Sequence, residues 1–359
     1  MRQEQWETFK RAAGGQTLSA VPLALIIDSP WIPAYLDIGH LDYYADPDVW
    51  FASNLKVMRE FPEVTFFPSW WIEYGMAIEP SVLGARISFR PDQPPGVLPG
   101  LLRIEDVDSV QRPDMRADGL AALALQLYRR QRQRILDAGY TIPVVAARGP
   151  LCTAAFFRGL SEFMIDLVEN PDPAHRLLEI TTGLTIDWLK AQAEAIGDSV
   201  EGILVLDDIP GLLSRNRYLE FAAPYLQRVF AAFPKQWVKV YHNDANILPF
   251  LEDLPEAGFD VLNWGKNIDF EEAYSRTGGK ITLMGNVSPL EVGVRGTAEE
   301  VGAASLSVLE KSAGRRLILS VGGGVSPGMP KTNIEAMIRA VREFNGCRSK
   351  PPINADRRG

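Results

Sequence analysis

The chain has 359 residues, of which 46% are hydrophobic and 23% charged, and its net charge is -8. This balance is typical of a globular protein with a large core, and an acidic chain without a basic block excludes nucleic acid as the main partner. Cys152 and Cys347 are the only two cysteines, which excludes a secreted disulfide scaffold and favours the cytoplasm. The first residues are charged and lack a signal-peptide pattern, and apolar runs of about ten residues are too short to span a membrane.

The first part of the chain alternates helical patterns with short apolar runs. In order, we expect a helix at 4–13, a strand at 21–27, a helix at 46–61 and a strand at 64–68. An excursion follows that is rich in aromatic residues and prolines and shows no clear helix. Insertions of this kind usually carry function or cover a site, and Trp70 is expected either to line a pocket or to pack the insertion onto the fold. A long helix at 118–138 and a strand at 142–147 come next.

The second part continues the same alternation. The predicted elements are a helix at 173–196, a strand at 202–206, a helix at 218–233, a strand in 237–246, a short helix at 250–257, a strand at 260–264, a helix at 270–276, a strand at 281–287, a helix at 297–313, a strand at 317–321 and a helix at 333–344. Thr297 and Glu300 form the pattern of a capping box at the start of one helix.

Apolar strands that alternate with helices predict a parallel sheet with helices outside it, and eight such units favour a closed (β/α)8 TIM barrel with an insertion after strand two. The alternative is an open doubly wound sheet, but no G-x-G-x-x-G turn follows the first strand. We expect residues 1–346 to form one barrel domain and residues 347–359 a charged C-terminal tail.

Polar side chains gather where the predicted strands end, and in a barrel these ends build the active-site face. A single aspartate at such a place is more often a turn or a helix cap, so the convergence is the informative feature. The residues are Asp28, Arg148, Asp207, Asp208, His242, Asp244, Asn263 and Asn286. With Trp70, they are the candidate catalytic and substrate-binding residues.

His242 and Asp244 lie two residues apart, so on a strand both side chains point to the same side. Asp207 and Asp208 are consecutive, and we expect only one of them to face the barrel mouth. One of these carboxylates with His242 and Asp244 would make a nitrogen- and oxygen-ligated metal site. Without a metal, His242 is placed to act as an acid or base near neutral pH.

Several stretches resemble the uroporphyrinogen decarboxylase superfamily, which includes the methyltransferases of corrinoid-dependent methyl metabolism. The matching residues are 148–159, 241–246, 285–289, 297–301, 324–330 and 333–334. The resemblance implies a (β/α)8 barrel with its cleft at the C-terminal ends of the strands. True uroporphyrinogen decarboxylases are expected to hold propionate groups with an arginine-rich segment after the first strand, and residues 28–35 contain no arginine.

The methyltransferase branch resembles the chain more closely. Its zinc enzymes typically carry His-x-Cys after strand five and another cysteine after strand eight. Here His242 matches, but Asp244 and Gly323 stand in the cysteine positions. The resemblance therefore implies a divalent metal, such as zinc, with oxygen-rich ligands that include His242 and Asp244, or no metal at all.

We therefore expect a methyltransferase that moves a methyl group from a small donor, such as a methoxylated aromatic compound, to a corrinoid on a separate cobalamin-binding protein. The alternatives are a decarboxylase of the uroporphyrinogen type and a non-catalytic protein that binds a small ligand. No nucleic acid or membrane partner is expected. The sequence leaves the oligomeric state open, and a dimer is compatible with it.

Overall fold

The computed structural model describes residues 1–16, 18–27 and 29–348. Its eight parallel strands follow one another in space in the order β2, β1, β10, β9, β8, β7, β6, β5. Two isolated bridges, Leu23 to Leu319 and Ile26 to Gly324, join the β1–β2 pair to the six-stranded sheet. The strands are β1 (Ala24–Ile26), β2 (Thr65–Phe67), β5 (Val144–Arg148), β6 (Gly202–Leu206), β7 (Val238–Asn243), β8 (Val261–Trp264), β9 (Thr282–Val287) and β10 (Leu317–Val321).

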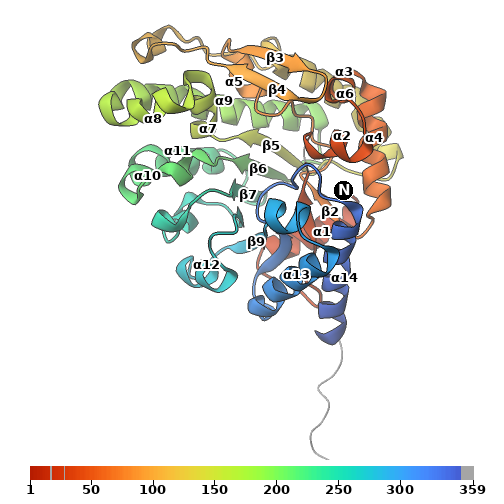
Figure 1. Ribbon diagram of the computed structural model, residues 1–359. Coiled ribbons are helices and arrows are strands. Elements are labelled where there is room, and N and C mark those ends of the chain that lie inside the picture. The colour runs from red at the N-terminus through yellow and green to blue at the C-terminus, as the bar shows by residue number, and fades with distance from the viewer. Residues whose placement is uncertain (17, 28, 349–359) are drawn as a thin grey trace, which may run out of the picture.

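This strand order is that of a (β/α)8 barrel, as predicted (Figure 1). Between β2 and β5, which would close the barrel, no strand pairing occurs among the described residues. The larger helices surround the strands: α4 (Pro47–Glu60), α6 (Gly119–Asp137), α7 (Pro150–Arg158), α8 (Leu160–Glu169), α9 (Pro171–Ile196), α10 (Arg215–Phe221), α11 (Ala223–Ala231), α12 (Phe270–Arg276), α13 (Ala298–Ser312) and α14 (Lys331–Arg348).

Side chains cap the starts of several helices, and one of these caps is the predicted capping box. Asp46 caps α4 by accepting hydrogen bonds from the main-chain N–H groups of Asp48 and Val49. Thr297 and Glu300 form the capping box of α13. Short helices α2 (Trp31–Leu36) and α3 (His40–Ala45) follow β1, while η2 (Ile209–Leu212) and the π-helical turn η5 (Pro289–Val294) follow β6 and β9. No described helix is both long and apolar enough to cross a membrane.

The side chains of each strand alternate between two cores. One core joins the outward-facing residues to the helices. The other fills the barrel and includes Ala146, Leu206, Val240 and Met284. The helix α1 (Gln3–Ala13) adds Trp6 and Phe9 to this inner core. An added side-chain carbon on Gly202, the first residue of β6, would meet Trp6 at 3.2 Å, so α1 covers the N-terminal end of the barrel.

Three local predictions were wrong. The helix expected at 250–257 is a pair of 3-10 turns, η3 (Leu248–Phe250) and η4 (Leu254–Ala257). The helix expected at 218–233 is divided into α10 and α11, because Pro224 has no N–H to continue the helix. The insertion after β2 holds a helix, α5 (Ile78–Val82), and an exposed hairpin of β3 (Arg86–Arg90) and β4 (Gln93–Leu98), followed by η1 (Ile104–Ser109).

Pro94 and Pro95 lie on β4, which is tolerated because β4 pairs with a neighbour on one side only. At the other end of the chain, α14 continues through Arg348. It therefore includes Cys347 and Arg348, which the sequence analysis assigned to the tail, and residues 349–359 lie outside the described residues.

Candidate functional site

One row of register-matched residues crosses four neighbouring strands at the C-terminal end of the barrel. Arg148 on β5 pairs with Leu206 on β6, Leu206 pairs with His242 on β7, and His242 pairs with Asn263 on β8. Leu206 belongs to the core inside the barrel, and register partners on adjacent strands point to the same face. The barrel interior is therefore faced by Arg148, His242 and Asn263. Their polar groups lie at the C-terminal end of the apolar inner core.

The hydrogen bonds of Asn263 fix the orientation of His242. The Asn263 side-chain nitrogen donates to the carbonyl oxygens of Met284 at 2.8 Å and Val321 at 3.1 Å. Its oxygen therefore faces His242 Nδ1, 2.6 Å away, and accepts a hydrogen bond from it. With the proton on Nδ1, the Nε2 atom of His242 is left to bind a proton or a metal.

Asp208 and Asp244 stand on the Nε2 side of His242. Asp208 Oδ1 lies 3.3 Å from His242 Nε2 and accepts a hydrogen bond of 3.1 Å from the main-chain N–H of Asp244. One ligand atom from each of the three residues lies within 4.8 Å of the others. Desolvation raises the pKa of Asp244, the charge of His242 lowers it, and the nearby Asp208 raises it again.

These three residues form a group that could hold a metal ion. An imidazole nitrogen and two carboxylates are suitable ligands for a divalent cation, and His242 is already in the tautomer that coordination through Nε2 needs. Without a cation, two carboxylates would face a nitrogen lone pair. The arrangement therefore favours a positive charge between them, either a proton or a metal ion.

Gly323, which follows β10, lies against the same group. A side-chain carbon built on Gly323 would lie 2.6 Å from Asp244 Oδ2. The two positions where relatives are expected to carry cysteines are thus adjacent in space, although neither residue is a cysteine here. The absence of a side chain at Gly323 leaves room for the Asp244 carboxylate.

Asp207 was a candidate catalytic residue, but its side chain contacts the start of helix α7. Its carboxylate accepts the main-chain N–H groups of Leu151 at 3.1 Å and Cys152 at 2.8 Å, in the first turn of α7. Its side chain is fully buried, and burial raises its pKa to about 8 against these two hydrogen bonds, which lower it. Consecutive residues at a strand end point in opposite directions, so Asp208 joins His242 while Asp207 holds α7.

The remaining candidates are distributed around this centre. Asn286 donates to the carbonyl oxygens of Gly265 at 3.2 Å and Ile268 at 2.7 Å and thus holds the loop after β8. Trp70 is buried against Phe51 and Trp50 of α4, with ring centroids 5.1 and 5.7 Å away, and so packs the insertion onto the barrel. Asp28 lies outside the described residues.

Two buried glutamates of the insertion were not found by the sequence analysis. Glu73 Oε2 lies 3.3 Å from Arg148 Nη2, and Glu79 Oε1 accepts the main-chain N–H of Arg148 at 2.7 Å. Burial raises the pKa of both glutamates. The only signal in the sequence was the presence of two acidic residues in a stretch otherwise dominated by aromatic and apolar residues.

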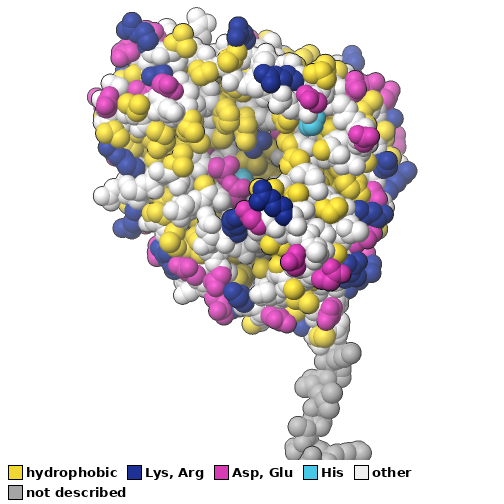
Figure 2. Space-filling model, viewed as in Figure 1, with side chains coloured by type: hydrophobic (Ala, Val, Ile, Leu, Met, Phe, Trp, Pro, Cys, Tyr) yellow, Lys and Arg dark blue, Asp and Glu magenta, His cyan; other side chains and the backbone are white. Residues whose placement is uncertain are grey.

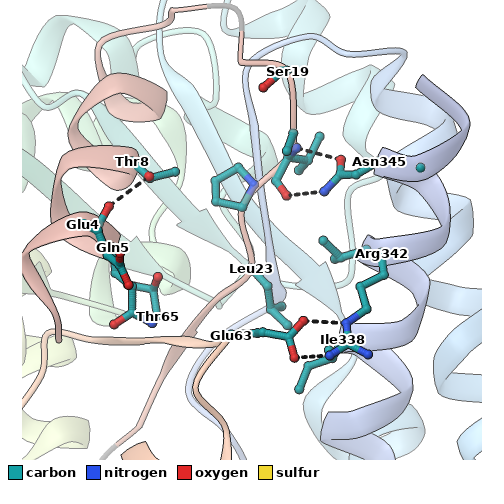
Figure 3. Close-up of a pocket in the computed structure, with 15 residues that line it drawn as sticks. Glu4, Gln5, Thr8, Ser19, Leu23, Glu63, Thr65, Ile338, Arg342 and Asn345 are labelled. Carbon is teal, nitrogen blue, oxygen red and sulfur yellow. Dashed lines mark hydrogen bonds and ion pairs between the residues drawn. The ribbon is translucent and has the colours of Figure 1, made fainter. Parts of the chain in front are cut away.

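Figure 2 shows a hollow on this face, with acidic, basic and histidine side chains at its floor and rim and hydrophobic side chains around it. A separate cavity of about 670 Å³ lies beside α1, the start of β1 and α14 (Figure 3). Glu63 and Arg342 form an ion pair across it, and Asn345 bonds to the main chain of Val21. This cavity contains none of the candidate residues, and its contacts hold α14 against the barrel.

The fold is a (β/α)8 barrel with a group of polar side chains at the C-terminal ends of its strands, which is where barrel enzymes carry their active sites. The chain matches the family model "Uroporphyrinogen decarboxylase (URO-D)" over residues 5–344 and therefore belongs to that family. Its named members that are similar to this chain are enzymes.

Curated relatives include the uroporphyrinogen decarboxylase of Coxiella burnetii (strain Dugway 5J108-111), which is 23% identical over 97% of this chain and 98% of the relative. The enzyme of the same name from Mus musculus is 24% identical over 94% of each chain. Among solved structures, a methyltransferase from Methanosarcina mazei is 21% identical, with a TM-score of 0.79 over 94% of this chain and 97% of the other. At this identity the structural likeness shows the fold alone.

Proposed function

We propose that this protein is a methyltransferase of a corrinoid-dependent system. It transfers a methyl group from a small methylated donor, such as a methoxylated compound, to cobalamin held by a separate protein. The observation that carries the proposal is the group of His242, Asp208 and Asp244, with His242 Nε2 turned toward the two carboxylates by Asn263. The Methanosarcina mazei structure, which bears the name methyltransferase, supports it as a relative in fold.

The reaction makes one demand that this group meets. When the methyl group moves to the cobalt(I) nucleophile, the carbon–oxygen bond of the donor breaks and its electron pair stays on the oxygen. That oxygen develops negative charge and must receive a proton or another positive charge. His242 and Asp244 stand where a positive charge is favoured, and Asp244 has a raised pKa, so a proton held there can pass to the leaving oxygen.

The same residues would hold a divalent metal. Asp208, His242 and Asp244 would be its ligands, and the metal would supply Lewis acidity at the leaving oxygen. The role of Asn263 is the same in either case, since it keeps the Nδ1 proton in place and Nε2 directed at the site. We expected either Asp207 or Asp208 to complete the site, and Asp208 is the one that lies beside His242 Nε2.

The proposal includes a partner protein that brings the corrinoid, and a cytoplasmic location. The purified full-length protein, given cob(I)alamin and methoxylated donors, should produce methylcobalamin, which is measured by its absorption spectrum. His242→Ala and Asp244→Ala should each abolish most of this activity. His175→Ala is the matched control, because His175 lies on the outer helix α9 and bonds to Tyr225 at 2.7 Å. Unchanged activity in the two site variants would refute the assigned roles.

A second candidate is a decarboxylase that acts on uroporphyrinogen. It is favoured by the curated relatives, which carry that name at 23 to 24% identity over nearly the whole chain. Against it, Arg148 is the only basic side chain at the inward-facing positions of the described strands, whereas the substrate carries several carboxylates. Incubation with uroporphyrinogen under anaerobic conditions separates the candidates: release of CO2 would establish the decarboxylase.

A further inference from the structure

The described strands of the barrel place one basic side chain where it could meet an anionic substrate. Among the inward-facing residues of the described strands, Arg148 alone is basic. It shares its register row with His242, two strands away, which places their main chains about 10 Å apart. A donor the size of a single aromatic ring, with its reacting oxygen at His242, would extend as far as Arg148.

The guanidinium of Arg148 is already engaged by the insertion. Its Nη2 atom lies 3.3 Å from Glu73 Oε2 and donates to the carbonyl oxygen of Gly75 at 3.3 Å. The guanidinium carbon stands 5.3 Å from the ring centre of Trp71. The side chains of Arg148 and Glu73 are only 8% and 4% exposed, so solvent screens their attraction weakly.

Glu73 is held in this position by a chain of hydrogen bonds. Its second carboxylate oxygen accepts the main-chain N–H of Ser29 at 2.8 Å and also the Ser29 hydroxyl. The Tyr44 hydroxyl in turn donates to Ser29 Oγ at 2.6 Å. Every contact of Glu73 is one that a carboxylate accepts, so the geometry is that of a charged glutamate opposite a charged arginine.

We propose that Glu73 makes this site select an uncharged methyl donor, because it pairs with the inward-facing arginine that a donor carboxylate would meet. This inference rests on the proposed methyltransferase function. On the far side of the mouth, Asp208 and Asp244 offer a donor carboxylate no cationic side chain. A donor carboxylate would therefore lose its water without gaining a cationic partner, whereas a neutral ether or phenol would lose little.

Two donors that differ only in a carboxylate test the inference: 2-methoxyphenol and 4-hydroxy-3-methoxybenzoate. Binding of each to the full-length protein is measured by titration calorimetry, which does not require turnover. The wild-type protein should bind 2-methoxyphenol at least tenfold more tightly. Glu73→Gln removes one carboxylate from the guanidinium and leaves the arginine charged, so the variant should bind the benzoate at least tenfold better than the wild type does.

Glu79→Gln is the matched control, since it also removes a buried carboxylate near Arg148 but one that bonds to the main-chain N–H and not to the guanidinium. It should leave the preference for 2-methoxyphenol unchanged. Equal or tighter binding of the benzoate by the wild type would overturn the inference, as would failure of both donors to bind. The wild-type comparison tests the preference for an uncharged donor, and Glu73→Gln tests whether that preference comes from Glu73.

Methyl transfer to cob(I)alamin is measured in parallel with the same two donors. If 2-methoxyphenol binds selectively but no methylcobalamin forms, the proposed function fails while the charge selectivity stands. If methylcobalamin forms equally well from both donors and they bind equally, the proposed function stands and the selectivity fails.

Discussion

Asn263 accepts a hydrogen bond from His242 Nδ1 at 2.6 Å while its own nitrogen is held by the carbonyl oxygens of Met284 and Val321. Because both carbonyls can only accept, the amide cannot turn over without losing two hydrogen bonds. The main chain of β9 and β10 thus determines which nitrogen of His242 is free for chemistry. This contact connects the packing of the barrel to the properties of its site.

The first prediction concerns the oxygen of Asn263. Asn263→Ala should reduce activity and metal affinity about 10- to 100-fold, because His242 loses the acceptor that fixes its tautomer. Asn263→Asp keeps an acceptor for Nδ1 but cannot donate to the two carbonyls. Asn263→Asp should therefore be at least as destabilised as Asn263→Ala. It should nevertheless bind metal more tightly than Asn263→Ala does. Calorimetric metal titration and urea unfolding measure the two effects separately.

Asn345→Ala serves as the control for that comparison. Asn345 also makes two hydrogen bonds from its side chain to the main chain, to the N–H and carbonyl of Val21, but at the other end of the barrel. It should lose stability and keep metal affinity. If Asn263→Ala and Asn263→Asp bound metal equally well, the proposed orientation of His242 would be refuted.

The second prediction concerns the metal itself. Protein purified without added metal and then titrated with Zn²⁺ should bind one equivalent, and binding should raise the unfolding temperature. Asp208→Asn, His242→Ala and Asp244→Asn should each weaken binding, because each removes one of the three grouped ligands. Asp207→Asn should not, because that carboxylate bonds to α7. Elemental analysis and calorimetry provide the measurements, and equal loss in all four variants would argue against this ligand set.

The row of Arg148, His242 and Asn263 could be predicted because side-chain alternation along a strand is a local property. The choice between Asp207 and Asp208 could not, since it depends on where the chain turns after β6 and on the N–H groups that α7 presents there. Glu73 could not be assigned either. It lies in an insertion without periodicity, and only the folded chain brings it to Arg148, 75 residues away.

The third prediction uses the pKa of Asp207, which burial raises to about 8, compared with about 4 in an unfolded chain. Between these values the folded protein holds a proton that the unfolded chain releases. The stabilisation from the neutral carboxyl is complete below about pH 4 and is lost as the pH rises toward about 8. The wild type should therefore lose up to about 1.4 kcal/mol of unfolding free energy per pH unit from this group alone.

Asp207→Asn cannot titrate, so its unfolding free energy should fall less steeply between pH 5 and pH 8 than that of the wild type. Urea unfolding at several pH values measures both slopes. Other buried carboxyls contribute equally to both proteins and cancel in the difference. Identical slopes would mean that Asp207 is ionised throughout this range, held so by the amide groups of α7.

The fourth prediction tests the contact between Gly323 and Asp244. Gly323 has a φ of 132°, so alanine there is strained in any background, and its side-chain carbon would also lie 2.6 Å from Asp244 Oδ2. Gly323→Ala should therefore destabilise the wild type and displace the carboxylate that we propose as a metal ligand. In an Asp244→Ala background only the backbone strain remains, because the obstructing carboxylate is absent.

A double-mutant cycle isolates the contact from the strain. The cost of Gly323→Ala should be smaller with Asp244→Ala than without it, by about 0.5 to 3 kcal/mol, which is the usual range for residues in direct contact. Metal affinity should fall in Gly323→Ala even though no ligand has been removed. Strictly additive unfolding free energies, together with unchanged metal binding in Gly323→Ala, would show that Asp244 does not depend on the space that the glycine leaves.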